Sequence, residues 1–148
     1  MLFRSLEHFK VIAEEEFLRS ARSGNPLAMA LFHIANFKEY HESNGYQRGD
    51  YVLRKFAEHL KKLEEMKVVA GRCYGATMAA LFKSHDYDQA KTLVDKFAGE
   101  FGEFSFYGEK KLASSKLVVK TVIEAYPLQD PPGFDEFFKS LEADIFKV

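Results

Sequence analysis

The sequence predicts an α+β fold in which a central, mainly antiparallel sheet is covered by helices. Apolar residues recur at helical spacing in several long segments, and shorter apolar runs of strand length lie between them. Around residue 75, two such runs flank a single glycine, as in a β-hairpin. A chain of 148 residues that is 47% hydrophobic has the usual size and composition of one domain. We therefore expect residues 1–148 to form a single domain.

The N-terminal half is predicted to contain a helix, a strand and two further helices. Apolar residues at three- and four-residue steps predict an amphipathic helix over residues 2–22. Residues 27–35 form a nearly continuous apolar run, which is typical of a short strand buried on both faces. Residues 37–43 are expected to form a short helix with Asn36 as a candidate cap, and residues 49–66 a long surface helix.

The hairpin is predicted from residues 67–74 and 76–83, with Gly75 between the two strands. Residues 86–98 then return to helical spacing, with apolar residues on one side and charged residues on the other. This order places a helix directly after the hairpin.

The C-terminal third is predicted to add two strands and a final helix. Gly99 and Gly102 are expected to end the preceding helix, and the alternating residues of 103–108 and 116–126 favour a further pair of strands. After a proline-rich loop, residues 134–148 show the apolar spacing of a helix. The phenylalanines in and near these segments favour core packing, and a surface aromatic patch for a partner is the alternative.

The composition excludes several classes of function. The 21 Lys and Arg residues nearly balance the 22 Asp and Glu residues, so the net charge does not favour nucleic acid or an anionic membrane as a partner. No uncharged apolar run approaches the roughly 20 residues that cross a bilayer. Cys73 is the single cysteine, which excludes an internal disulfide and fits a reducing, cytoplasmic location.

Four stretches, in order, resemble the GGDEF family of bacterial diguanylate cyclases. ALFHIANFKEYHESNGYQRGDYVLRKFAEHL is similar to its first motif, apolar-D-x-D-x-F-K followed by N, G-H, G-D and a long helix. VAGRCYGATMAALF resembles its V-A-R-Y-G-G-D-E-F-A-L-L hairpin. VVKTVIEAYP and FKSLEADIFK resemble its last strand and closing helix, so that the likeness covers residues 5–148. The resemblance implies a nucleotide-cyclase-like fold with a ferredoxin-like core.

The family's chemistry depends on residues that this chain replaces. Joining two GTP molecules requires divalent metal held by carboxylates, one at the end of the first strand and one at the third letter of the hairpin motif. In this chain the first position is His33, and the hairpin motif reads Tyr74-Gly75-Ala76-Thr77-Met78. We therefore expect no metal, no cofactor and no cyclase activity. We also expect the Tyr74 ring to fill the vacated pocket.

Four residues are candidates for a remnant nucleotide pocket around Gly75. His33 is either a substitute metal ligand or a partly buried, hydrogen-bonded histidine. His41 occupies the position of a guanine-reading Asn in the family, and its alternative is a helix-end histidine. Asp50 matches a guanine-binding Asp of the family, but the interpretation as a helix cap is preferred. Lys38 matches a lysine near the triphosphate, and a solvated lysine is the alternative.

Three functions remain open, and the first is preferred. The leading hypothesis is a catalytically inactive GGDEF-like domain that binds a protein partner or regulates bacterial signalling. The second is a sensor that binds a guanine nucleotide through Asp50, His41 and Lys38 without converting it. The third is an active cyclase that uses His33 as a substitute ligand.

Overall fold

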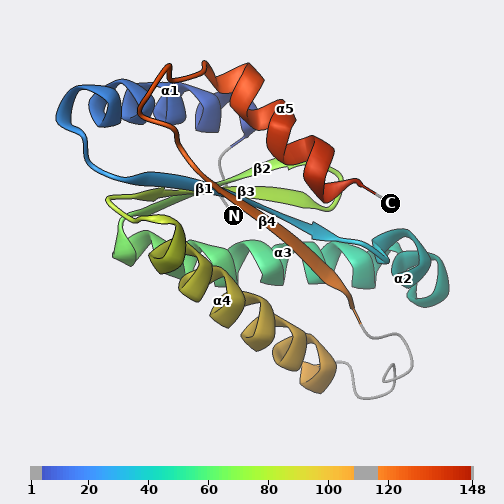
Figure 1. Ribbon diagram of the computed structural model, residues 1–148. Helices are drawn as coiled ribbons and strands as arrows, with labels where there is room; N and C mark the ends of the chain where they lie inside the picture. Colours follow the sequence, from blue (N-terminus) through green and yellow to red (C-terminus); the bar gives the residue numbers. More distant parts are fainter. Residues whose placement is uncertain (1–4, 109–116, 148) are drawn as a thin grey trace.

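The computed structural model describes residues 5–108 and 117–147, which form a sheet between two layers of helices (Figure 1). Helices α1 and α5 cover one face of the sheet, and α3 and α4 cover the other. The elements are α1 (Leu6–Ser23), β1 (Leu27–Ile34), α2 (Phe37–Asn44), α3 (Tyr46–Lys61), the 3-10 helix η1 (Lys62–Met66), β2 (Val68–Tyr74), β3 (Thr77–Lys83), α4 (Tyr87–Gly108), β4 (Val119–Ala125) and α5 (Phe134–Ile145). This arrangement confirms the predicted α+β class.

The sheet has the strand order β2-β3-β1-β4, and all neighbouring strands are antiparallel. Strand β1 lies between β3 and β4, and seven of its eight residues are buried, which confirms the prediction from its continuous apolar run. The hairpin of β2 and β3 is also confirmed. Strand β4 forms one edge of the sheet within the described residues.

The side chains on the two faces of β1 belong to two separate hydrophobic clusters, because successive side chains of a strand point in opposite directions. Ala28, Ala30, Phe32 and Ile34 belong to the cluster under α3 and α4. The alternate residues belong to the cluster under α1 and α5, and they are Leu27, Met29 and Leu31. The core is therefore split by the sheet into two layers.

Helix α1 approaches strand β2 closely at Gly71. A Cβ atom added to this glycine would lie 2.9 Å from the Cβ atom of Phe9. Real Cβ atoms do not come this close to another carbon, so only glycine allows the helix to pack at this distance. The absence of a side chain at residue 71 thus sets the position of α1.

The prediction was wrong about the segment after residue 98. Helix α4 continues through Gly99 and Gly102 to Gly108, so residues 103–108 are helical and form no strand. Each glycine costs a helix only about 1 kcal/mol relative to alanine, and the buried residues Ala90, Val94 and Phe97 already anchor α4 on the sheet. The predicted strand in residues 116–126 is confirmed as β4.

Two smaller expectations also changed. The long helix begins at Tyr46 rather than residue 49, and its last turn is the 3-10 helix η1. The phenylalanines of residues 134–138 are at most 6% exposed, so this segment forms core and no surface aromatic patch. The side chains of the other aromatic segment, residues 101–107, lie outside the described part of the structure.

Within residues 5–108 and 117–147, every helix is too short or too polar to cross a membrane.

Candidate functional site

The C-terminal end of β1 and the turn between β2 and β3 lie side by side. In the register of the sheet, His33 is opposite Thr77. The backbone N–H of Ile34 donates a hydrogen bond of 3.1 Å to the carbonyl oxygen of Ala76. The structure therefore brings His33 together with the Tyr74–Met78 turn, as the sequence predicted. We call this part of the molecule the hairpin end of the sheet.

His33 is partly buried, and its polar and aromatic neighbours are specific. Its Nδ1 atom lies 2.9 Å from the hydroxyl oxygen of Thr77, and the edge of its ring meets Phe146 with the centroids 4.9 Å apart. Burial lowers the pKa of the imidazole, and the nearby charge of Lys120 lowers it further. The ring is thus held in its neutral form, as a hydrogen-bonded histidine between β3 and the end of α5.

The turn itself is made possible by Gly75. Its φ of +54° lies in the left-handed region, where a side chain is strained. The guanidinium of Arg72 donates a hydrogen bond of 2.9 Å to the carbonyl oxygen of Gly75. This carbonyl is therefore engaged by the chain's own arginine.

Tyr74 does not fill an interior pocket, contrary to the sequence-based expectation. Its side chain is 44% exposed, and its hydroxyl donates a hydrogen bond to the carboxylate of Glu142 in α5. Partial burial raises the pKa of the phenol, and the hydrogen bond and negative charge of Glu142 act in the same direction. Figure 1 shows the turn beneath the C-terminal end of α5, which this contact ties to the hairpin.

The three remaining residues of the motif are buried. Ala76 is 7% exposed and Met78 is 1% exposed, and both belong to the cluster under α3 and α4. Thr77 is 1% exposed, and His33 is its hydrogen-bond partner. These positions contribute to the packing of the sheet.

Lys38, His41 and Asp50 lie in the helical segment after β1. Lys38 is exposed in α2, and the side chain of His41 lies outside the described part of the structure. The carboxylate of Asp50 is 72% exposed and lies 3.6 Å from Nε of Arg54. Asp50 falls in the second turn of α3, whose N-cap is Gly45, so the interpretation of Asp50 as a cap was wrong.

The two positions at which the resemblance places metal-binding carboxylates carry His33 and Ala76 in this chain. Mg²⁺ takes oxygen ligands, chiefly carboxylates, whereas His33 offers an imidazole held by Thr77 and Ala76 offers only a methyl group. Among the side chains that the structure describes, no group of three or more His, Cys, Asp or Glu could hold a metal ion.

Cys73 precedes the turn and is partly buried against the cluster under α1 and α5. Burial raises the pKa of its thiol to about 12, and the charge of Glu142 adds to this shift. The thiolate, which is the reactive form of cysteine, is therefore rare at neutral pH.

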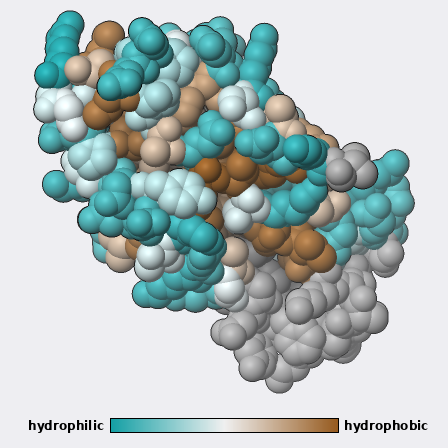
Figure 2. Space-filling view, in the orientation of Figure 1, coloured by the Kyte–Doolittle hydropathy of each residue, from teal (hydrophilic) through white to brown (hydrophobic). Residues whose placement is uncertain are grey.

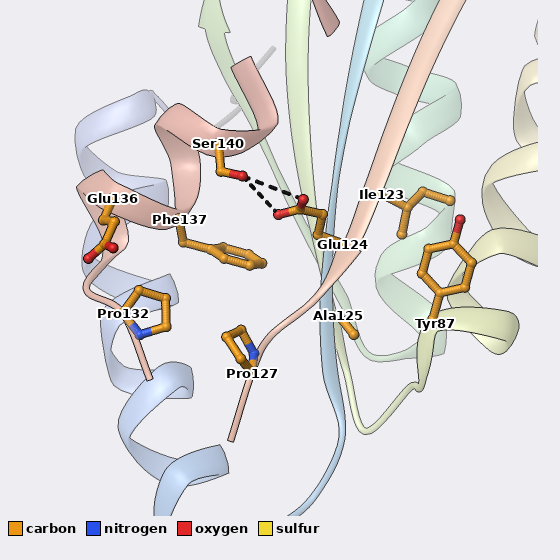
Figure 3. A pocket seen from close by; sticks show the side chains of 9 residues that line it. All are labelled: Tyr87, Ile123, Glu124, Ala125, Pro127, Pro132, Glu136, Phe137 and Ser140. Carbon is orange, nitrogen blue, oxygen red and sulfur yellow. Dashed lines mark hydrogen bonds between the residues drawn. The ribbon is translucent and has the colours of Figure 1, made fainter. Parts of the chain in front are cut away.

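A pocket of about 500 Å³ lies on the edge strand β4, toward its C-terminal end (Figure 3). Pro127, Pro132 and Phe137 supply apolar walls, and Glu124 and Glu136 supply carboxylates. The hydroxyl of Ser140 in α5 lies 3.2 Å from Oε2 of Glu124. Sequence reasoning missed this pocket because its residues come from α4, β4, the proline loop and α5, and only the fold brings them together.

The comparison with protein families gives one match, to the family described as "Diguanylate cyclase, GGDEF domain", over residues 5–127. No curated protein matches the chain.

Solved structures of similar fold come from the same group of domains. The active GGEEF domain of a diguanylate cyclase from Vibrio cholerae matches with a TM-score of 0.86 at 16% identity, over 99% of this chain and 90% of that one. The GGDEF domain of DgcB from Caulobacter crescentus, in complex with c-di-GMP, matches with a TM-score of 0.79 at 15% identity, over 96% and 82%. At these identities the likeness concerns the fold.

A third similar structure is the diguanylate cyclase SiaD from Pseudomonas aeruginosa, in complex with its activator SiaC. It matches with a TM-score of 0.77 at 14% identity, over 97% of this chain and 54% of SiaD.

Proposed function

Because this chain belongs to the GGDEF domain family, we propose that it is a non-catalytic member that acts as a protein-interaction or regulatory module in bacterial signalling. The observation that carries the proposal is the contact between His33 and Thr77. The hydrogen bond with Thr77 occupies Nδ1 of His33, and the resemblance places a metal-binding carboxylate at this position at the end of β1.

The electrostatics of the hairpin end support this proposal. Diguanylate cyclase chemistry gathers negative charge on phosphate oxygens, which a metal must neutralise. Burial lowers the pKa of His33 and so favours its neutral form, and Ala76, at the third position of the hairpin motif, is apolar. Neither residue can hold a hard cation or supply a positive charge to a triphosphate.

A turnover assay tests the proposal. The purified chain is incubated with GTP and either Mg²⁺ or Mn²⁺, with the GGEEF domain of Vibrio cholerae as the positive control, and the products are separated by chromatography. We expect no cyclic di-GMP from this chain. Product from the wild type would overturn the proposal, and its loss in a folded His33→Ala variant would point to the histidine as a substitute ligand.

The exposed carboxylate of Asp50 favours a second candidate, a guanine-nucleotide sensor. Guanine presents two neighbouring N–H donors that a carboxylate can accept, and the Asp50 side chain is 72% exposed on α3. Its partner Arg54 forms only a long, exposed ion pair of 3.6 Å with it, which contributes about 0.5 kcal/mol or less. A ligand can therefore displace Arg54 at small cost.

Thermal-shift measurements with GTP, GDP, GMP and cyclic di-GMP decide between the two candidates. A ligand at about 100 times its dissociation constant should stabilise the fold by roughly 2.7 kcal/mol. Stabilisation that is lost in Asp50→Ala, but kept in the neighbouring control Arg54→Ala, would support the sensor. No shift with any nucleotide would favour the protein-interaction role.

A further inference from the structure

Strand β4 has an open backbone edge. The N–H of Tyr126 donates to the carbonyl of Leu27 at the start of β1, and the carbonyl of Val118 accepts from the N–H of Ala35 just after β1, at 2.8 Å each. Because backbone groups alternate in direction along a strand, the even-numbered residues of β4 bond to β1. The N–H and C=O groups of the odd-numbered residues point away from it, and these are Val119, Thr121, Ile123 and Ala125. No other described strand lies on this side of β4.

The open edge carries an apolar stripe. Figure 2 shows groups of brown atoms across the middle of the molecule, along the course that β4 takes in Figure 1, interrupted by paler and hydrophilic atoms. Val118 is 51% exposed, and Val119, Val122 and Ile123 are only partly buried. An exposed apolar edge strand is a template for pairing with another strand.

The charges on β4 are complementary to those of a second β4. The side chains of Lys120 and Glu124 point to the α5 face of the sheet, since Glu124 meets Ser140 of α5 and Lys120 shares its parity. When two copies of β4 pair antiparallel about a two-fold axis at Val122, Lys120 of each copy lies opposite Glu124 of the other. Such cross-strand side chains are about 5 Å apart at Cβ, close enough for an ion pair.

The same register satisfies the backbone. Thr121 then faces Ile123 of the second copy, and Val119 faces Ala125. The backbone N–H and C=O groups of all four residues point to the open edge, so the facing residues can exchange hydrogen bonds. Moving the axis to Thr121 or Ile123 keeps the backbone pairing but places Lys120 opposite Val122 or Tyr126. Only the axis at Val122 forms both ion pairs.

The pocket on β4 fits this arrangement. Glu124 and Ala125 line it, and they are the residues that face Lys120 and Val119 of the second copy. Figure 3 shows Glu124 between Ile123 and the Ser140 hydroxyl, with Phe137, Pro127 and Pro132 on the α5 side of the strand. A lysine entering here would place its aliphatic stem against apolar walls and its ammonium near the carboxylates of Glu124 and Glu136.

From these observations, we infer that the chain forms a symmetric dimer through antiparallel pairing of β4 with β4 of a second copy, with reciprocal Lys120–Glu124 ion pairs. The two sheets then join into one continuous sheet, and both edges at the junction are closed. The inference rests on the proposed interaction role in naming a second copy of the chain as one partner.

A charge-swap experiment tests the dimer by analytical ultracentrifugation over a concentration series. The wild type should reach about twice the chain mass of 17.0 kDa. Lys120→Glu and Glu124→Lys each place like charges opposite each other twice in the symmetric dimer, and each should weaken self-association by about tenfold. An equimolar mixture of the two variants should form a heterodimer as tight as the wild type, because every pair is again of opposite sign. The double variant Lys120→Glu/Glu124→Lys should recover for the same reason.

A backbone variant tests the pairing itself. Thr121→Pro removes an N–H that points to the open edge and not to β1, so the monomer should stay folded while the dimer is lost. Thr121→Ala keeps this N–H and should still dimerise. Circular dichroism establishes that each variant is folded.

A wild-type monomer at the highest soluble concentration overturns the dimer. A dimer whose affinity the charge swaps and Thr121→Pro leave unchanged also overturns it, because association then uses another surface. Neither result bears on catalysis, which the GTP assay measures separately. Conversely, cyclic di-GMP formation would overturn the non-catalytic role without affecting the β4 interface.

Discussion

The face of the sheet under α1 and α5 and the hairpin end are stabilised in different ways. Under α1 and α5, aromatic rings pack on one another, with Phe17 stacked on Tyr126 at 4.1 Å and meeting Phe137 edge-on at 5.6 Å. At the hairpin end, pairs of polar groups satisfy one another, as in His33 with Thr77 and Tyr74 with Glu142. The first depends on removal of apolar area from water, the second on hydrogen bonds in partial contact with water.

This difference explains how the fold can be kept when the residues at the hairpin end are exchanged. A buried aromatic ring contributes several kcal/mol, whereas a hydrogen bond near the surface contributes about 1 kcal/mol. Exchanging polar residues at the hairpin end therefore changes the local chemistry at little cost in fold stability. The following variants test this ranking.

Phe17→Ala should have the largest effect. Phe17 is 4% exposed and its ring contacts three other aromatic rings, so its removal leaves a cavity between α1 and α5. We expect a loss of about 3–5 kcal/mol in the free energy of unfolding, measured by urea denaturation. Leu18→Ala is the matched control, since this neighbour is 58% exposed and should change the stability by about 0.5 kcal/mol or less. Equal effects of the two variants would contradict the comparison.

Gly71→Ala should have the next largest effect. The new Cβ would lie 2.9 Å from the Cβ of Phe9, which cannot move without moving α1. We expect a loss of about 1–3 kcal/mol. The opposite sign is expected for Gly99→Ala in α4, where the new methyl group meets open space and the helix gains up to about 1 kcal/mol. Similar changes for both would show that α1 is not held by close approach at Gly71.

Tyr74→Phe should cost less, about 0.5–1 kcal/mol, because it removes one hydrogen bond from a side chain that is 44% exposed. Thermal unfolding with Tyr87→Phe as the control measures this, since Tyr87 is exposed to nearly the same extent at 43%. A loss of stability as large as that of Phe17→Ala would show that the hairpin end contributes as much to fold stability as the aromatic cluster does.

The pH dependence of the free energy of unfolding tests the environment of His33 at the hairpin end. Burial lowers the folded-state pKa of His33 below the unfolded value of 6.5, so the unfolded chain takes up its proton first as the pH falls. The free energy of unfolding should therefore be highest above about pH 6.5 and decrease as the pH falls through 6.5 toward the folded-state pKa.

Urea titrations at several pH values measure this slope, and His33→Gln should reduce it. The groups facing the ring are Lys120, Thr77 and Phe146, of which only Lys120 is charged, so no carboxylate in contact opposes the effect. His59 also has a burial-lowered pKa, and His59→Gln serves as a comparison at a distant site. An unchanged slope in His33→Gln would contradict the assigned environment of His33.

The pattern of apolar residues predicted most of the fold. The continuous run of β1 and the spacing of Phe56 and Leu60 in α3 report burial directly, and both are buried as expected. The extension of α4 through Gly99 could not be predicted, because local propensity favours ending the helix there. The start of α3 at Tyr46 was missed for a similar reason, since the Gly49-Asp50 pair imitates a helix start.

The sequence predicted which residues lie at the candidate site, but not which side chains contact one another there. The sequence resemblance placed His33 beside the turn, and the register of β1 and β3 confirms this. The bond between Tyr74 and Glu142 joins residues 68 apart in the chain, and no local pattern signals it. The sequence analysis did not single out Lys120 and Glu124, because their proposed role depends on β4 being at the edge of the sheet.

The environment of Cys73 has a practical consequence for spectroscopy. A thiol with a pKa of about 12 reacts slowly with maleimides and nitroxide reagents at neutral pH. A second, exposed cysteine can therefore be introduced and labelled selectively while the native residue stays in place. Spin labels near β4 would then report distances between two copies of the chain directly, without a cysteine-free background.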